Sequence, residues 1–130
     1  MRIKIGDFGL AVRLNSRNER RSSFCGTPNY MAPEVCMNKD RLDAIREGSP
    51  HVPDPSLYAL PVDIWALGVI MYNLLIGKSP FPYGDTKQNY SNIRRSRYKY
   101  PSDRAQQVSP EAKDLIHLIL NPDPELRPTI

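Results

Sequence analysis

Cysteine, tryptophan and long apolar runs are scarce in this chain. Its 130 residues include two cysteines and one tryptophan. Cys25 and Cys36 are too few for a disulfide framework and lack the spacing of a metal site, so we expect two reduced thiols. The apolar stretch from Ile64 to Ile76 is too short to cross a bilayer, and Asn73 interrupts it. These shortages exclude the disulfide-rich and membrane-spanning classes of protein.

A strong excess of one charge is also lacking, because the net charge is only +4. The arginines are accompanied by no stacking platform and no known reader motif, so we expect no nucleic-acid partner. The opening residues, MRIKIGDFG, contain no apolar core of the length that a secretory signal needs. We therefore predict an intracellular protein of the cytoplasm, the nucleus or both, with no membrane partner.

Apolar periodicity predicts a mainly α-helical fold with a short β-hairpin at the N-terminus. Residues 2–5 alternate polar and apolar side chains, and residues 10–14 supply a second strand-like run. The run 62–76 has the length of a helix and apolar side chains on every face, and Gly77 follows as its stop. A helix of that kind belongs in the middle of a domain.

Polar residues mark the ends of further helices. Asp85 is expected to cap a helix that reaches Arg95, and Ser109 to cap a helix that begins at Pro110. A short helix is expected over residues 32–39. Residues 40–61 are rich in proline and charge, and we expect only one or two helical turns there before an irregular connection.

Four motifs occur in order along the chain. They are Asp7-Phe8-Gly9, CGTPNYMAPE over 25–34, DIWALGVIMY over 63–72 and DPELRPT over 123–129. Their order and spacing resemble the second half of a protein kinase domain, where Asp-Phe-Gly and Ala-Pro-Glu bracket a phosphorylatable segment. Within that family, KIGDFGLA, CGTPNYMAPEV and RPTI look most similar to the polo-like serine/threonine kinases.

The resemblance implies part of the C-terminal lobe of a kinase whose parent fold is α+β. It implies an activation segment over 7–34 and a helical lobe over 62–130. Residues 38–58 look inserted relative to polo-like kinases, either as a species-specific loop or as untranslated sequence included in error. The family reaction moves the γ-phosphate of ATP to a protein Ser or Thr with the help of Mg²⁺.

The resemblance also implies roles for individual residues. Asp7 would chelate the Mg²⁺ that bridges the ATP phosphates, Phe8 would pack against a regulatory helix, and Gly9 would let the backbone reverse. Thr27 would touch the catalytic Asp of a complete kinase, and Asp63 would accept hydrogen bonds from the catalytic loop. Without the resemblance, Asp7 is an ordinary turn residue and Asp63 stabilises a helix N-terminus.

The resemblance implies roles for two further pairs of residues, two neighbouring serines and a glutamate with an arginine. Ser22 and Ser23 lie in a loop that is rich in arginine (Arg13, Arg17, Arg20, Arg21). Ser23 occupies the position where polo-like kinases are activated by an upstream kinase, and a phosphate there would pair with arginine; the alternative is an unmodified serine. Glu34 and Arg127 match the buried ion pair that ties the activation segment to the lobe, whereas such residues elsewhere are usually surface charges.

Several parts that a kinase needs are missing from these 130 residues. There is no Gly-rich phosphate loop, no strand Lys with its Glu partner and no His-Arg-Asp catalytic loop. We therefore expect a chain that begins at the activation segment, stops before its last helix is complete, binds ATP and Mg²⁺ only within the parent kinase, and is inactive alone. The alternative is a kinase remnant that acts as a non-catalytic interaction module, and an unrelated helical protein is a remote third.

Partners follow from the same resemblance. The parent kinase would act on protein substrates and would itself be a substrate of the upstream kinase. Helices that precede Asp-Phe-Gly in the family would cover part of the apolar run 62–76. Without them we expect a marginally stable fragment that aggregates unless a partner or chaperone binds it.

Overall fold

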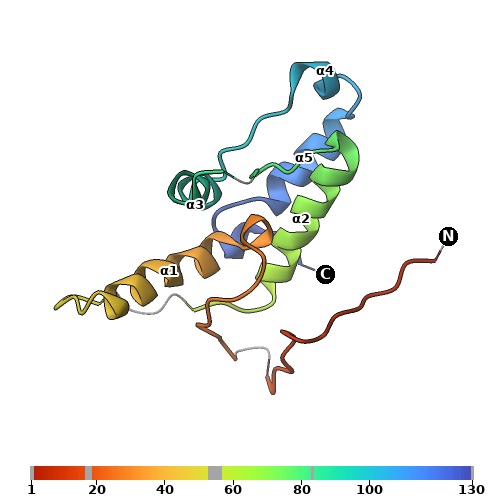
Figure 1. The fold of residues 1–130 in the computed structure, drawn as a ribbon. Helices are drawn as coiled ribbons and strands as arrows, with labels where there is room; N and C mark the ends of the chain where they lie inside the picture. The colour runs from red at the N-terminus through yellow and green to blue at the C-terminus, as the bar shows by residue number, and fades with distance from the viewer. Residues whose placement is uncertain (1, 17–18, 53–56, 83, 130) are drawn as a thin grey trace.

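The computed structural model describes residues 2–16, 19–52, 57–82 and 84–129. These residues are mainly helical, as predicted, and the elements run in sequence along the chain (Figure 1). The α-helices are α1 (Pro33–Arg46), α2 (Pro61–Ile76), α3 (Thr86–Arg94), α4 (Ser102–Ala105) and α5 (Pro110–Ile119), and the 3₁₀ helices are η1 (Pro28–Tyr30) and η2 (Pro124–Leu126).

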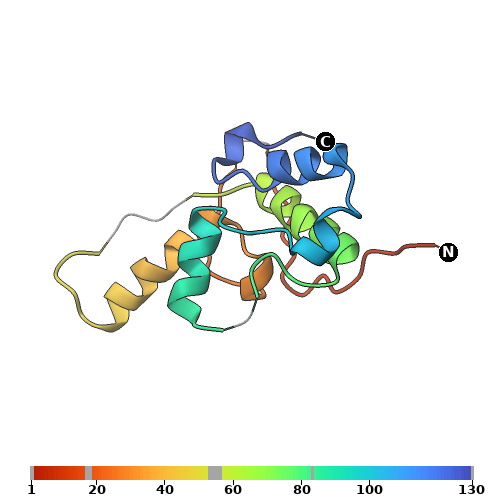
Figure 2. The same cartoon turned by 90° about the horizontal axis from the view of Figure 1, so that it is seen from above.

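The helices pack as two pairs. Helix α2 lies beside α5, and α1 lies beside α3 (Figures 1 and 2). The first described residues of the N-terminal segment extend away from both pairs (Figure 1), whereas residues 10–12 and 14 line a pocket together with Val35 of α1 and Val62 of α2. None of the helices in the described ranges is long and apolar enough to cross a bilayer.

The predicted N-terminal hairpin is wrong. Residues 2–14 contain no strand, and Ile3 and Ile5 are 88% and 86% exposed. A single hairpin with nothing packed on its apolar side is marginal in water, so alternation of side chains does not suffice to form one. The β-pairing found in the described residues is an isolated antiparallel bridge between Arg21 and Tyr58.

The predicted helix ends are confirmed where the sequence offers a capping residue. The Asp85 carboxylate accepts a hydrogen bond from the Gln88 N–H at 3.0 Å, and the Ser109 hydroxyl accepts one from the Ala112 N–H at 3.2 Å. Gly77 ends α2 with φ 78°, a left-handed conformation that glycine adopts without steric cost. Local chemistry therefore sets the start of α3, the start of α5 and the end of α2.

Helix α1 is longer than predicted. The short helix expected over 32–39 and the separate turns expected after it form one 14-residue helix. Lys39 and Asp43 form an ion pair one turn apart, across the expected break, which supports continuous helix. The helix thus enters the 38–58 segment that the resemblance marked as inserted; residues 53–56 of that segment lie outside the described residues.

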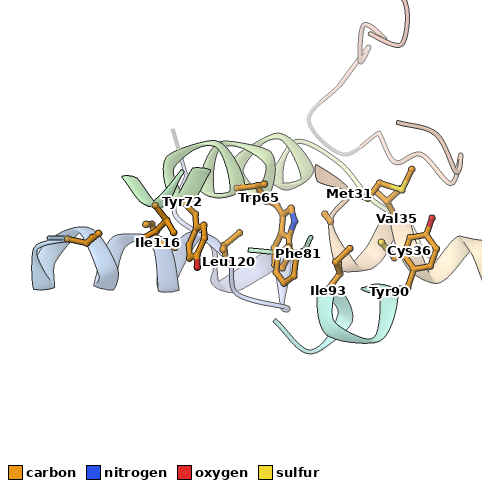
Figure 3. Packing of buried hydrophobic residues seen from close by; sticks show 14 residues of the cluster. Met31, Val35, Cys36, Trp65, Tyr72, Phe81, Tyr90, Ile93, Ile116 and Leu120 are labelled. Atoms are coloured by element: carbon orange, nitrogen blue, oxygen red, sulfur yellow. The ribbon is translucent and has the colours of Figure 1, made fainter. Parts of the chain in front are cut away.

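The core is built on one face of α2. Trp65 is completely buried and stacks on Phe81 with ring centroids 5.6 Å apart. Gly68 is also on this face, where a Cβ atom would lie 2.4 Å from Ile119 Cγ2, so glycine permits the close approach of α5. Figure 3 shows the core extending from Ile116 and Leu120, past Trp65 and Phe81, to Cys36, Tyr90 and Ile93 between α1 and α3.

The opposite face of α2 is apolar but exposed. Leu67, Ile70 and Leu74 follow one another at helical spacing and are 47%, 42% and 80% exposed. The sequence predicted apolar side chains on every face of this helix. The described residues cover one of those faces and leave this one open to solvent.

Candidate functional site

A buried ion pair joins the two ends of the helical region. Arg127 Nη1 donates to Glu34 Oε1 at 2.7 Å, and Nη2 donates to Glu34 Oε2 at 2.8 Å. Glu34 and Arg127 are only 6% and 4% exposed. Two parallel charge-assisted hydrogen bonds fix both the distance and the orientation of the two groups. The structure therefore brings together the two residues that the motifs paired.

The rest of the Arg127 guanidinium is also satisfied. Nε donates to the Asn121 carbonyl at 2.9 Å, and the remaining donors reach the carbonyls of Pro61 at 2.9 Å and Pro122 at 3.3 Å. The Trp65 ring lies 5.1 Å below the guanidinium carbon. An arginine has five N–H donors, and each has an acceptor here, which offsets the cost of burying the charge.

Local sequence places both partners. Glu34 follows Pro33 in the first turn of α1, where proline fits and a carboxylate is favoured by the helix dipole. Arg127 follows η2, whose start is capped by Asp123 accepting from the Glu125 N–H at 3.0 Å. The ion pair thus joins the first turn of α1 to the residue that follows η2, two places that are far apart in sequence.

The Asp7-Phe8-Gly9 motif lies on the exposed N-terminal segment. Asp7 has φ 60°, and the Ala11 N–H donates to the Phe8 carbonyl at 3.0 Å, so the motif forms a turn. Phe8 is 67% exposed. The described part of the chain contains no group of three or more side chains of the kinds that ligate metals. Asp7 therefore offers a single, accessible carboxylate.

Thr27 and Asp63 line the same shallow pocket, of about 150 Å³. Thr27 precedes η1, and Asp63 lies in the first turn of α2; both are exposed. Apolar residues, Val35 and Val62 among them, also line this pocket. The pocket thus presents a hydroxyl and a carboxylate at the end of the segment that starts with Asp7.

Ser22 and Ser23 are exposed and follow an anchored residue. Arg21 exchanges two backbone hydrogen bonds with Tyr58, at 2.9 and 2.8 Å. The Arg21 guanidinium lies 2.5 Å from the Glu19 carboxylate. Of the other arginines predicted to surround the serines, Arg17 lies outside the described residues. The two serines therefore stand beside a cation that already has a carboxylate partner.

Sequence reasoning missed a polar contact that links η1 to α3. The Asn89 side-chain amide donates to Asn29 Oδ1 at 3.2 Å, and both residues are buried. Asparagine is usually exposed, and nothing in the spacing of these two residues marks them as partners. The Phe24 ring, which meets the Tyr90 ring edge-on, is a further contact between this segment and α3.

Comparison with known proteins agrees with this arrangement. The chain matches the protein kinase domain over residues 1–130. It is 40% identical, over its whole length, to a protein of Dictyostelium discoideum named probable serine/threonine-protein kinase PLK, of which it covers 11%. It is 38% identical to the serine/threonine-protein kinase polo of Drosophila melanogaster, again over its whole length and over 19% of that protein.

A yeast relative gives the same picture. The cell cycle serine/threonine-protein kinase CDC5/MSD2 of Saccharomyces cerevisiae is 43% identical over 128 residues, which are 98% of this chain and 16% of the yeast protein. The chain thus spans about a tenth to a fifth of the length of these relatives. From the match over its full length, the chain belongs to the protein kinase domain family.

Proposed function

We propose that this chain is the C-terminal-lobe part of a polo-like serine/threonine kinase, which transfers the γ-phosphate of ATP to protein serine or threonine. The observation that carries the proposal is the buried, two-pronged contact between Glu34 and Arg127. It fixes the Ala-Pro-Glu end of the segment 7–34 to the helices over 62–130. An intracellular location, and protein substrates as partners, belong to the same proposal.

Asp7 is proposed as the Mg²⁺ ligand. Magnesium sites in kinases use one or two carboxylates together with the phosphates of the nucleotide, so one accessible carboxylate fits the ion. When bound, Mg²⁺ neutralises charge on the ATP phosphates. The chain's contribution is to hold the Asp7 carboxylate at the turn closed by the Ala11 N–H and the Phe8 carbonyl. Phe8 remains available to pack against a further element of the kinase, and Gly9 leaves the turn free of a side chain.

Thr27 and Asp63 are proposed as supports of the catalytic loop. Both side chains face one pocket beside the start of α2. A carboxylate such as Asp63 accepts hydrogen bonds from backbone N–H groups, which hold a loop rigidly when several are made at once. Thr27 supplies a hydroxyl that both donates and accepts. Neither residue carries out proton transfer, so these 130 residues alone are proposed to be inactive and to hold neither ATP nor Mg²⁺ tightly.

Residues 38–58 are also proposed to be an insertion relative to polo-like kinases. The first part of this segment continues α1 as far as Arg46, and Tyr58 near its end pairs with Arg21 of the activation segment. An insertion with these two attachments leaves the Glu34 end of α1 in place. The proposed division of the chain is therefore an activation segment over 7–34, an insertion over 38–58 and a helical lobe over 62–130.

A chimera tests the kinase proposal. These 130 residues would replace the matching part of the Drosophila polo kinase, and transfer of phosphate from Mg-ATP to casein would be measured. We expect transfer that is lost with Asp7→Asn and retained with Asp103→Asn, a matched change on the exposed surface of α4. A folded chimera without transfer would reject the proposal. The isolated chain should show no transfer above a control without protein.

Ser23 is proposed as the site that an upstream kinase phosphorylates, with Ser22 as the neighbouring candidate. A phosphate adds nearly two negative charges and would compete with Glu19 for the Arg21 guanidinium. In the active chimera, mass spectrometry should find Ser23 modified, and Ser23→Ala should lower activity while Ser16→Ala does not. Full activity with unmodified Ser23 would reject this assignment.

The alternative function is a non-catalytic interaction module. The exposed apolar face of α2 favours it, because such a face is available to a partner. The chimera separates the two functions. Phosphate transfer that depends on Asp7 supports the kinase, whereas a stable, inactive chimera supports the interaction module, to which a chaperone or another protein would bind.

A further inference from the structure

A charged groove lies between α1 and α3, which run side by side in Figure 2. Its volume is about 320 Å³. Residues of α1 form one wall, and residues of α3 and its C-terminal end form the other. The charged lining residues are Lys39, Asp40, Asp43, Lys87, Arg94 and Arg95.

Both carboxylates of the groove are already paired. Asp43 forms an ion pair with Lys39 along α1, and Asp40 lies 2.8 Å from Arg94 across the groove. The hydrogen bond from Lys39 lowers the pKa of Asp43, and nearby cations including Lys87 lower it further, so this carboxylate is charged at neutral pH. Arg94 is fixed in addition by its donation to the Cys36 carbonyl at 2.9 Å.

Two cations of the groove form no ion pair among the described residues. Lys87 and Arg95 are exposed and form no ion pair with any residue in the described ranges. They stand at opposite ends of α3, so their backbones are roughly 12 Å apart along the helix axis at about 1.5 Å per residue. An extended peptide rises about 3.3 Å per residue, so side chains about four positions apart match this distance.

The positive surface continues beyond the groove. Arg97 and Lys99 are exposed, whereas Tyr98 and Tyr100 between and after them pack into the aromatic cluster around Tyr72. This alternation turns the two cations outward along the segment that leaves α3. Outside the groove, the segment that leaves α3 therefore adds two exposed cations.

We propose that the groove between α1 and α3 binds an acidic, extended peptide segment of a protein partner. Separate Asp or Glu side chains of the peptide contact Lys87 and Arg95, while the peptide backbone passes Asp40 and Asp43. A nucleic acid fits less well, because its closely spaced phosphates would face those two carboxylates and the groove offers no exposed aromatic ring for a base to stack on. The binding requires neither ATP nor phosphate transfer.

A swap of charge tests the proposal. The 130-residue chain, fused to a soluble carrier, would be titrated into a fluorescein-labelled peptide with Glu at every fourth position among Gly and Ser, and into its Lys counterpart, with fluorescence anisotropy as the readout. The parent should prefer the Glu peptide. Lys87→Glu/Arg95→Glu turns an excess of two cations in the groove into an excess of two anions. It should weaken binding of the Glu peptide roughly tenfold and create a preference for the Lys peptide.

The control variant is Arg2→Glu/Lys4→Glu, which changes the net charge equally on the distant N-terminal segment (Figure 1). It should keep the Glu preference of the parent. An equal loss in both variants would show that only net charge matters and would overturn the proposal, as would a parent that does not bind the Glu peptide. Tighter binding of a single-stranded DNA oligonucleotide of equal charge would overturn it in favour of nucleic acid. Gain of Lys-peptide binding by the reversed variant also shows that its groove is folded.

Discussion

The chain divides into two regions that differ in packing. Residues 2–27 contain no helix and no fully buried side chain among those that the structure describes. Residues 28–129 contain the helices, the aromatic core and the buried ion pair. The two cysteines illustrate this difference in burial, because Cys25 is exposed and Cys36 is wholly buried.

The contrast separates most of the proposed chemistry from stability. Of the proposed site residues, Asp7, Ser23 and Thr27 lie in the exposed region, whereas Asp63 and the buried pair Glu34 and Arg127 lie in the packed one. Burial of apolar surface supplies most of the free energy of folding, so that free energy resides in the second region. Substitutions in the first region should therefore change binding and chemistry with little effect on unfolding. Substitutions of buried residues in the second should lower the free energy of unfolding.

Loss of the buried ion pair should have the largest effect on stability. Glu34→Gln leaves the Arg127 cation buried without its carboxylate, which costs roughly 3–5 kcal/mol. Urea unfolding followed by circular dichroism, at protein concentrations where the chain is monomeric, measures this cost. The matched control is Arg104→Gln, which breaks an exposed pair with Asp103 at 3.9 Å and should cost under about 1 kcal/mol. Equal costs for the two changes would contradict the role of burial in the stability that the Glu34–Arg127 pair provides.

Replacement of one glycine by alanine in each region should change the free energy of unfolding less than loss of the ion pair does. Gly68→Ala places a Cβ atom 2.4 Å from Ile119 Cγ2 and should destabilise the α2–α5 contact by about 1–3 kcal/mol. Gly6→Ala places its Cβ where no other atom lies within 4 Å, so it should leave the free energy of unfolding unchanged. The pair of variants is compared by the urea midpoint. A neutral Gly68→Ala would mean that α5 shifts to accommodate the methyl group.

The sequence predicts the local features of this fold better than the contacts between distant segments. Caps such as Asp85 and Ser109, and the stop at Gly77, are local, and they place the helix ends correctly. The motif residues Glu34 and Arg127 could be paired only through the family resemblance, because they are 93 positions apart. The hairpin over 2–14 failed because alternation says nothing about whether another element covers the strands. The contacts between Asn29 and Asn89, and between Arg21 and Tyr58, have no signal in a single sequence, since each depends on how helices and loops meet in space.

Alkaline pH should distinguish the two cysteines. Burial raises the pKa of the Cys36 thiol from 9.0 to about 12. The unfolded chain therefore loses this proton at lower pH than the folded chain, so stability should fall as pH rises from about 9 towards 12, by up to about 1.4 kcal/mol per pH unit. Cys36→Ala should remove the part of this decline that precedes tyrosine ionisation near pH 10. In the native chain at mildly alkaline pH, an alkylating reagent should modify Cys25 and leave Cys36 intact; equal rates would contradict its burial.

The exposed face of α2 should contribute least to the free energy of unfolding. Leu74 is 80% exposed, so Leu74→Gln removes little packing and should change that free energy by no more than about 0.5 kcal/mol. Its effect should appear in association, because Leu67, Ile70 and Leu74 form one apolar stripe that water meets directly. Sedimentation should show less self-association for Leu74→Gln, and the variant should bind less of a hydrophobic dye because its apolar stripe is smaller. The control is Leu126→Gln, which removes a similarly exposed leucine, 63% exposed, from η2 outside the stripe and should leave association as it is. If the unaltered chain is monomeric and binds no dye, the stripe is not a contact surface, and the proposal of an interaction module loses the observation that favours it.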